Sequence, residues 1–206
     1  MKKIMFNDRY GLTQAVLEGK KTMTRQIVPI DLYNQTDWKA FADGDFEAVV
    51  DGEGYYHDIR NCGKYHIGEE VAIAQPYKND DVLTYNAYNE DGTAREDGFG
   101  RHKEMLDSKG YRNKMFVRAD LMPHRIRITN IKVERLQDIS DEDCLREGLL
   151  AGEQEPRMYG FRLPKGTVLS FLTPREAFAA LIDRISGRGT WQRNPWVYAY
   201  TFELIK

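Results

Sequence analysis

Two lysines, two threonines and an arginine follow a glycine near the N-terminus, in the run Gly19-Lys20-Lys21-Thr22-Met23-Thr24-Arg25. These side chains offer positive charge, hydrogen-bond donors and hydroxyl groups within one short segment. A threonine hydroxyl becomes a nucleophile toward an amide carbonyl when a base takes its proton, and a neutral lysine can be that base. Burial and neighbouring cations would lower the lysine pKa toward neutrality. The run is therefore typical of a site that meets an anion or breaks an amide.

Each of these residues also has a structural interpretation. Thr22 and Thr24 favour strands and can alternate along an exposed one. Lys20 and Lys21 follow a predicted helix end, where cations complement the helix dipole. In a regular strand Lys21 and Thr24 point to opposite faces, so a shared site requires a turn or a bulge between them.

Other chemical signatures are weak or missing. The short glycine pairs do not make a phosphate-binding loop, and no Gly-x-Ser-x-Gly motif is present. The histidines lack metal-ligand spacing, and the two cysteines lie far apart without a CxxC pair: His57, His66, His102, His124, Cys62 and Cys144. We therefore expect no metal, no cofactor and no disulfide framework.

The charge is segregated along the 206 residues, although the net charge is only −2. Residues 1–30 carry six Lys/Arg against two Asp/Glu, and residues 111–206 carry sixteen against twelve. Residues 31–110 are acidic, with eight Lys/Arg against eighteen Asp/Glu. Basic ends suit a surface that faces a polyanion, whereas the acidic middle is either a solvated insertion or a protein-interaction surface.

Targeting signals are not recognisable in the sequence. No apolar run reaches the ~20 residues that a membrane span needs, and the apolar stretch before Asn7 is too short for a secretory signal. We expect a cytoplasmic protein without membrane contact, with a monomer as the favoured state.

The predicted elements at the N-terminus are a strand over Lys3–Phe6, a helix capped by Asn7 or Asp8 that ends at Gly19, and a strand over Lys20–Val28. Two polar segments follow, at about residues 31–66 and 78–114, separated by a predicted strand at Val71–Ala74. Turn signals between residues 43 and 54 suggest a hairpin in the first segment. We interpret both segments as insertions that are not apolar enough to hold a core.

The C-terminal third carries stronger signals. The apolar side chains from Ile126 to Val133 change parity, which predicts a β-bulge near Thr129-Asn130. Ser140 and Thr173 each predict a helix start, the latter as a capping box followed by Pro174. The second helix would bury Phe178, Leu181, Ile182 and Ile185 and stop at Gly187, and a half-buried strand is predicted from Trp196 to Leu204.

Four stretches in order resemble the ASCH domain family, whose small barrels are related to PUA RNA-binding domains. The first is Gly19–Arg25, which is similar to the family signature G-[RK]-K-T-x-T-x-R. The others are Gly68–Val71, Arg127–Ser140 with Asp143–Gly148 after it, and Asn194–Val197 with the aromatic strand that follows. The resemblance covers about half of the chain. It implies one α+β domain over residues 1–206: a PUA-like small mixed β-barrel with flanking short helices and the two polar insertions.

The resemblance also implies a site. Some small ASCH proteins are amidohydrolases that deacetylate N4-acetylcytidine, and their catalytic residues fall here, by motif position, on Lys21, Thr24 and Glu147. A carboxylate such as Glu147 can orient the lysine or handle the proton of the leaving amine. In a helix's last turn, however, Glu147 can equally be a solvated residue.

The general expectation is a PUA-like protein that binds RNA or a modified nucleotide in a basic pocket. Its ligand-binding residues would be Lys20, Thr22, Arg25, Arg125, Arg127 and Trp196. Arg125 and Arg127 can instead be the polar face of a strand, and Trp196 a core residue. Amide hydrolysis of an N4-acylated cytidine-type nucleoside is the narrower alternative, and a protein-interaction module built on the acidic insertions is the third.

Overall fold

The computed structural model describes residues 1–44, 46–154 and 157–205, and a mixed five-stranded sheet forms its centre. The strands lie in the order β1 (Lys2–Ile4), β5 (Glu70–Ile73), β6 (Arg125–Arg135), β10 (Trp196–Ile205) and β2 (Met23–Ile27). β1 is parallel to β5, and the other neighbours are antiparallel. Within the described residues β1 and β2 each pair on one side only, so the strands do not close into a ring. The α+β class is confirmed, and in the described part of the chain the central sheet is open, with β1 and β2 as its edge strands.

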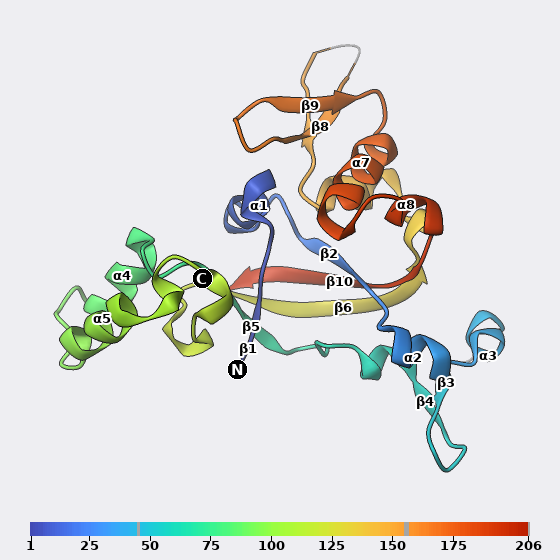
Figure 1. Cartoon of the computed structure of the whole chain (residues 1–206), viewed down its shortest axis with the longest axis horizontal. Coiled ribbons are helices and arrows are strands. Elements are labelled where there is room, and N and C mark those ends of the chain that lie inside the picture. The colour runs from blue at the N-terminus through green and yellow to red at the C-terminus, as the bar shows by residue number, and fades with distance from the viewer. Residues whose placement is uncertain (45, 155–156, 206) are drawn as a thin grey trace.

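The remaining elements surround this sheet (Figure 1). Two small antiparallel sheets consist of β3 (Glu47–Val50) with β4 (Tyr56–Asp58), and of β7 (Leu150–Ala151), β8 (Tyr159–Arg162) and β9 (Val168–Phe171). The α-helices are α1 (Leu12–Leu17), α2 (Ile30–Gln35), α3 (Trp38–Ala42), α4 (Asp80–Ala87), α5 (Gly98–Asp107), α6 (Asp141–Arg146), α7 (Pro174–Ser186) and α8 (Thr190–Arg193). Short 3₁₀ helices lie at Asp8–Tyr10 (η1), Ile59–Cys62 (η2), Lys109–Tyr111 (η3), Lys114–Phe116 (η4), Ala119–Leu121 (η5) and Leu136–Asp138 (η6).

The two long strands at the centre confirm one prediction and correct another. The register between β6 and β10 shifts where Thr201 pairs with Asn130 and Phe202 with Ile128, which leaves Thr129 as the predicted bulge residue. The expectation that β10 is half-buried is wrong. Val197 is as buried as its neighbour Tyr198, because β10 lies inside the sheet and side chains pack on both of its faces.

The N-terminal segment forms shorter elements than predicted. Asn7 does cap a helical turn, η1, but Gly11 adopts a left-handed conformation (φ 71°) and separates it from α1. The single helix predicted up to Gly19 is therefore two pieces. The predicted strand over Lys20–Val28 begins only at Met23, because the Lys21 and Thr22 amides donate to the Ala15 and Arg146 carbonyls, outside the sheet.

The two helices nearest the sheet's β2 side begin as predicted. The Ser140 hydroxyl accepts a hydrogen bond from the Asp143 amide at the start of α6, and Thr173 and Glu176 form the predicted capping box of α7. Three acidic residues lie in the first turn of α6, where they are favourable to the helix dipole. The Ser140 cap fixes the start of α6, the helix that carries the carboxylates described below.

The two polar insertions lie at opposite ends of the sheet in Figure 1, with α2, α3 and the β3–β4 hairpin at one end and α4 with α5 at the other. The hairpin matches the prediction for residues 43–56. Both insertions contribute side chains to cores that they share with the rest of the chain, and Val49 and Ile59 of the first insertion pack into the main core. Val82 and Met105 belong to a second cluster beside β5. In the described part of the chain, no helix is both long and apolar enough to cross a membrane.

Candidate functional site

The segment Lys20–Arg25 lies along the C-terminal end of α6. Gly19 takes a left-handed conformation (φ 71°) after α1, and the Lys21 amide then donates to the Ala15 carbonyl instead of to a strand. The Thr22 amide donates to the carbonyl of Arg146 at 2.9 Å. This turn provides the change of direction that a common site for Lys21 and Thr24 requires.

Lys21 forms a buried ion pair with Glu147. Its Nζ atom lies 2.6 Å from Glu147 Oε2 and donates a second hydrogen bond to the Glu147 carbonyl at 2.8 Å. Lys21 and Glu147 are 2% and 5% exposed, so the interpretation of Glu147 as a solvated helix residue is wrong. Gly148 (φ 96°) is placed close to this pair, and a Cβ atom there would lie 3.2 Å from Lys21 Cβ. The glycine therefore allows the lysine to pass beside the helix end.

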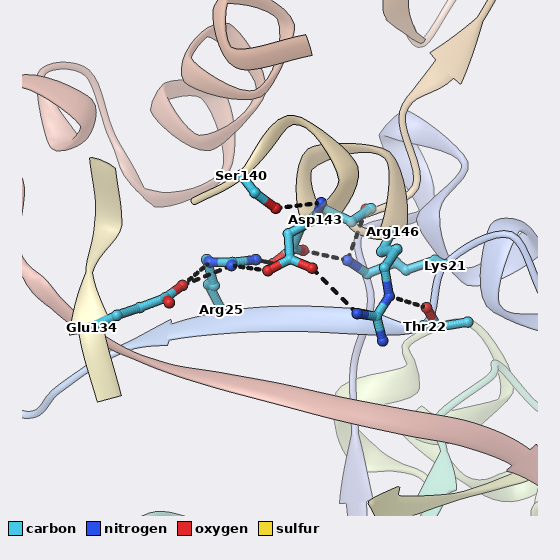
Figure 2. Close-up of polar contacts among 8 residues, drawn as sticks. Lys21, Thr22, Arg25, Glu134, Ser140, Asp143 and Arg146 are labelled. Carbon is cyan, nitrogen blue, oxygen red and sulfur yellow. Dashed lines mark hydrogen bonds and ion pairs between the residues drawn. The ribbon is translucent and has the colours of Figure 1, made fainter. Parts of the chain in front are cut away.

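Arg25 binds three carboxylates from two other elements. Its guanidinium donates to Glu134 of β6 at 2.7 Å, to Asp143 of α6 at 3.2 Å and to Glu147 Oε1 at 3.1 Å. Figure 2 shows the Arg25 head group between the Glu134 and Asp143 side chains, while Lys21 approaches α6 from the other side. Arg146 completes the network, because it donates to Thr22 Oγ1 and pairs with Asp143. Three cations and three carboxylates make up this charge cluster.

The pKa values of the two basic residues move in opposite directions. Burial lowers the pKa of Lys21, and the attraction of Glu147 only partly offsets this effect. Burial also acts to lower the pKa of Arg25, but the nearby carboxylates of Glu147 and Glu134 outweigh this effect, so the pKa of Arg25 is raised. Arg25 is therefore a permanent cation, whereas Lys21 is the group in the cluster that can more readily become neutral.

A cavity of about 410 Å³ opens beside the cluster. Lys21, Thr24, Arg25 and Glu147 line one wall. α7 contributes the apolar residues Phe178, Leu181, Ile182 and Ile185 to the lining. The N-terminal segment contributes Met5, Phe6, Asn7, Asp8, Arg9 and Leu12, and Lys114 also lines the cavity. Within the described residues the Thr24 side chain has no hydrogen-bond partner, so its hydroxyl is available to a ligand.

The structure thus gathers four of the predicted site residues and places the other five elsewhere. Lys20 is exposed, pairs with Glu18 at 2.6 Å and lines a separate hollow, and Thr22 serves as the acceptor for Arg146. Arg125 and Arg127 project from the far end of β6 and pair with Glu70. They form a polar strand face, as one interpretation of the sequence had it.

Trp196 also lies away from the cavity. Its ring stacks on Trp38 at 4.4 Å and lies under the Arg135 guanidinium. The residue is partly buried against the core, which matches its interpretation as a core residue. Base stacking on this ring would require Trp38 to move.

Sequence reasoning missed several members of the site. Glu134, Asp143 and Arg146 bind the motif residues, and Arg9 and Lys114 line the cavity. The signal for Asp143 and Glu147 was their i, i+4 spacing on a capped helix, which puts both carboxylates on one face. On α7 the predicted burial of Phe178, Leu181 and Ile182 is confirmed, but that of Ile185 is wrong: it is 38% exposed and lines the cavity. Among the described residues no group of three His, Cys, Asp or Glu could hold a metal ion.

Comparison with known proteins adds nothing to this geometry. The chain matches no protein-family model, no curated protein and no solved structure.

Proposed function

We propose that the chain is an ASCH-type, PUA-like domain that binds a modified nucleoside or nucleotide in the cavity beside the charge cluster. One observation carries the proposal: Lys21, Thr24 and Arg25 of the N-terminal motif share a cavity wall with Glu147, more than 120 residues later in the sequence. The four stretches that resemble the family also contribute to one sheet, since they contain or directly precede β2, β5, β6 and β10. This common placement supports the assignment to a PUA-like fold.

A purely structural role for the charge cluster is the less economical explanation. Moving a charged group from water into the protein interior costs several kcal/mol before it is paired. Replacing a buried ion pair by apolar residues therefore often leaves the stability of a protein unchanged or raises it. Buried charges with shifted pKa values that line a cleft are typical of functional sites. Here Lys21 is almost fully buried, has a lowered pKa and faces a cavity.

The size and lining of the cavity favour a single nucleoside over a nucleic-acid strand. Its volume of about 410 Å³ lies within the range of about 300–1,000 Å³ that is usual for small-ligand sites. The α7 face, with Phe178 and Leu181, can pack against a base, while Thr24 and the cluster offer polar contacts. RNA would bind by inserting one unstacked base into the cavity, because proteins usually recognise RNA sequence through unstacked bases.

Calorimetric titration with N4-acetylcytidine and other modified nucleosides tests this proposal. We expect binding by the wild-type chain and at least a tenfold loss in Ile185→Trp, because this exposed residue of α7 lines the cavity and a larger side chain there would occupy it. Ile30→Trp, at a position 68% exposed and away from the cavity, is the matched control and should bind normally. Absence of binding to any nucleoside or RNA by the wild type would refute the proposal.

Amide hydrolysis is the second candidate, because a lysine with a lowered pKa lines the same cavity as a threonine hydroxyl that has no hydrogen-bond partner among the described residues. Neutral Lys21 would take the Thr24 proton as Thr24 Oγ1 attacks the amide carbon. The C–N bond then breaks, and the amine leaves with the proton returned from Lys21. Water hydrolyses the resulting threonine ester and restores the hydroxyl. Glu147 orients Lys21 throughout, through the 2.6 Å contact.

Acetate release from N4-acetylcytidine separates the two candidates. Thr24→Val and Lys21→Met should each abolish release, with retained folding checked by circular dichroism. Glu147→Gln keeps a carbonyl oxygen for Lys21, and we expect a partial loss with a shifted pH profile. Binding of N4-acetylcytidine without acetate release would leave the binding proposal standing and reject hydrolysis of this substrate.

A further inference from the structure

Two arginines beside the cavity, Arg9 and Arg162, form no ion pair with any carboxylate among the described residues. Arg9 lines the cavity and also an adjoining open hollow of about 440 Å³, and Arg162 of β8 lines that same hollow. Both are exposed. In the described part of the chain, neither guanidinium lies within ion-pair distance of a carboxylate. The cations inside the cavity, Lys21 and Arg25, are by contrast fully paired.

Contacts between η1 and the β8–β9 hairpin hold these arginines beside one hollow. Tyr10, next to Arg9, packs edge-on against Phe161, next to Arg162, with ring centroids 5.7 Å apart. The stem of Arg162 lies against Gly11, where an added Cβ atom would be 3.9 Å from Arg162 Cδ. The two guanidinium groups thus come from packed segments on either side of one opening.

The local charge at this opening is positive. Asp8 also lines the hollow, but its carboxylate already pairs with Lys114 at 2.7 Å. The charge cluster beside the cavity balances three cations with three carboxylates, and only Lys21, Arg25 and Glu147 of these residues line the cavity. Lys20 chiefly, and Arg162 to a small extent, lower the pKa of the Glu18 carboxylate, but Glu18 already pairs with Lys20 at 2.6 Å. The charges at this hollow that no ion pair balances are therefore those of Arg9 and Arg162.

From this distribution we propose that the ligand carries a phosphate group, and that Arg9 and Arg162 bind it in the outer hollow while the nucleoside occupies the cavity. This inference rests on the proposed function and names its ligand class: a nucleoside monophosphate. Arginine suits the role because its planar, weakly hydrated guanidinium matches phosphate oxygens with two parallel hydrogen bonds. The balanced interior offers no spare positive charge, so the anionic part of a nucleotide belongs at the opening.

Calorimetric titration of N4-acetylcytidine against its 5′- and 3′-monophosphates tests the inference. We expect one monophosphate to bind at least ten times more tightly than the nucleoside at low salt, with the advantage reduced as salt screens the exposed arginines. In Arg9→Gln/Arg162→Gln the ratio of the two affinities should fall to near one. Lys103→Gln, which removes an exposed charge on α5, should keep the wild-type ratio.

The outcomes separate this inference from the proposed function. Nucleoside binding that Ile185→Trp abolishes, with no gain from either phosphate, would overturn the phosphate contact alone. A phosphate advantage that survives in the double variant would also overturn it. Failure of the nucleoside and of both monophosphates to bind would overturn both proposals. A short oligonucleotide that binds more tightly than the monophosphates, with the same dependence on both arginines, would support the phosphate contact and assign its source to RNA.

Discussion

Arg25 on β2 and Arg127 on β6 belong to the same sheet and contact carboxylates, yet their surroundings are opposite. The Arg25 side chain is 1% exposed and binds Glu134, Asp143 and Glu147. The Arg127 side chain is 45% exposed and binds Glu70 and Glu203. An exposed ion pair contributes little, about 0–1 kcal/mol, whereas breaking a buried one leaves unpaired charge away from water. The same residue type thus serves a site in one place and a solvated strand face in the other.

The largest expected difference between the two regions is in stability. Arg25→Leu leaves three carboxylates close together, and we expect a loss of about 3–5 kcal/mol in the free energy of unfolding. Arg127→Leu, the matched change at the exposed position, should cost less than about 1 kcal/mol. Urea denaturation of both variants measures the contrast. Equal losses would mean that burial does not distinguish the two arginines.

The pH dependence of stability sharpens the role of Lys21. Its pKa in the folded chain is lowered, so between that value and the ordinary lysine pKa of ~10.4 the unfolded chain binds more protons. Wild-type stability therefore gains a positive contribution with rising pH in this window, with a slope of at most about 1.4 kcal/mol per pH unit. Lys21→Met should lack that contribution.

The comparison must be made between the two proteins at each pH, because other groups titrate nearby. Burial raises the pKa of Cys144 to about 12. Above the ordinary thiol pKa of ~8.5 the unfolded chain loses this proton first, which lowers stability as pH rises. The effect is present in both proteins and cancels in the difference. A difference that does not change between neutral pH and pH 10 would contradict the lowered lysine pKa.

A smaller effect is expected from the cap of α6. Ser140→Ala removes the hydrogen bond to the Asp143 amide and should cost about 1 kcal/mol, with weaker nucleoside binding because α6 presents Glu147 to the cavity. Asp37→Ala removes the corresponding cap of α3, far from the cavity, and should lower stability by a similar amount. Nucleoside titration of both variants is the check. Equal effects on binding would show that α6 does not position the site.

The sequence predicted local structure better than long-range contacts. The bulge at Thr129 and the capping box at Thr173 were readable because the signals lie within a few residues. The change of parity of the β6 side chains and the Thr-Pro-x-Glu spacing are local consequences of backbone geometry. These elements came out where they were expected.

The sequence did not predict which charged residues contact one another. Arg25 contacts Glu134 and Glu147, more than 100 residues away, and a single sequence carries no trace of that pairing. Arg127 lies between Ile126 and Ile128 and Arg25 between Thr24 and Gln26, and neither neighbourhood identifies a carboxylate partner. Only the packing of α6 over the end of β2 buries one and leaves the other in solvent.

The most direct test of the central claim is an amide ¹H–¹⁵N correlation spectrum of the protein titrated with N4-acetylcytidine or its monophosphates. The proposal predicts that the largest shift changes occur at Lys21–Arg25, at Glu147 and along α7, with little change at Arg125, Arg127 and Glu203. Changes concentrated at Arg125, Arg127 and Glu203, or no change at any residue, would contradict the assignment of the cavity as the ligand site.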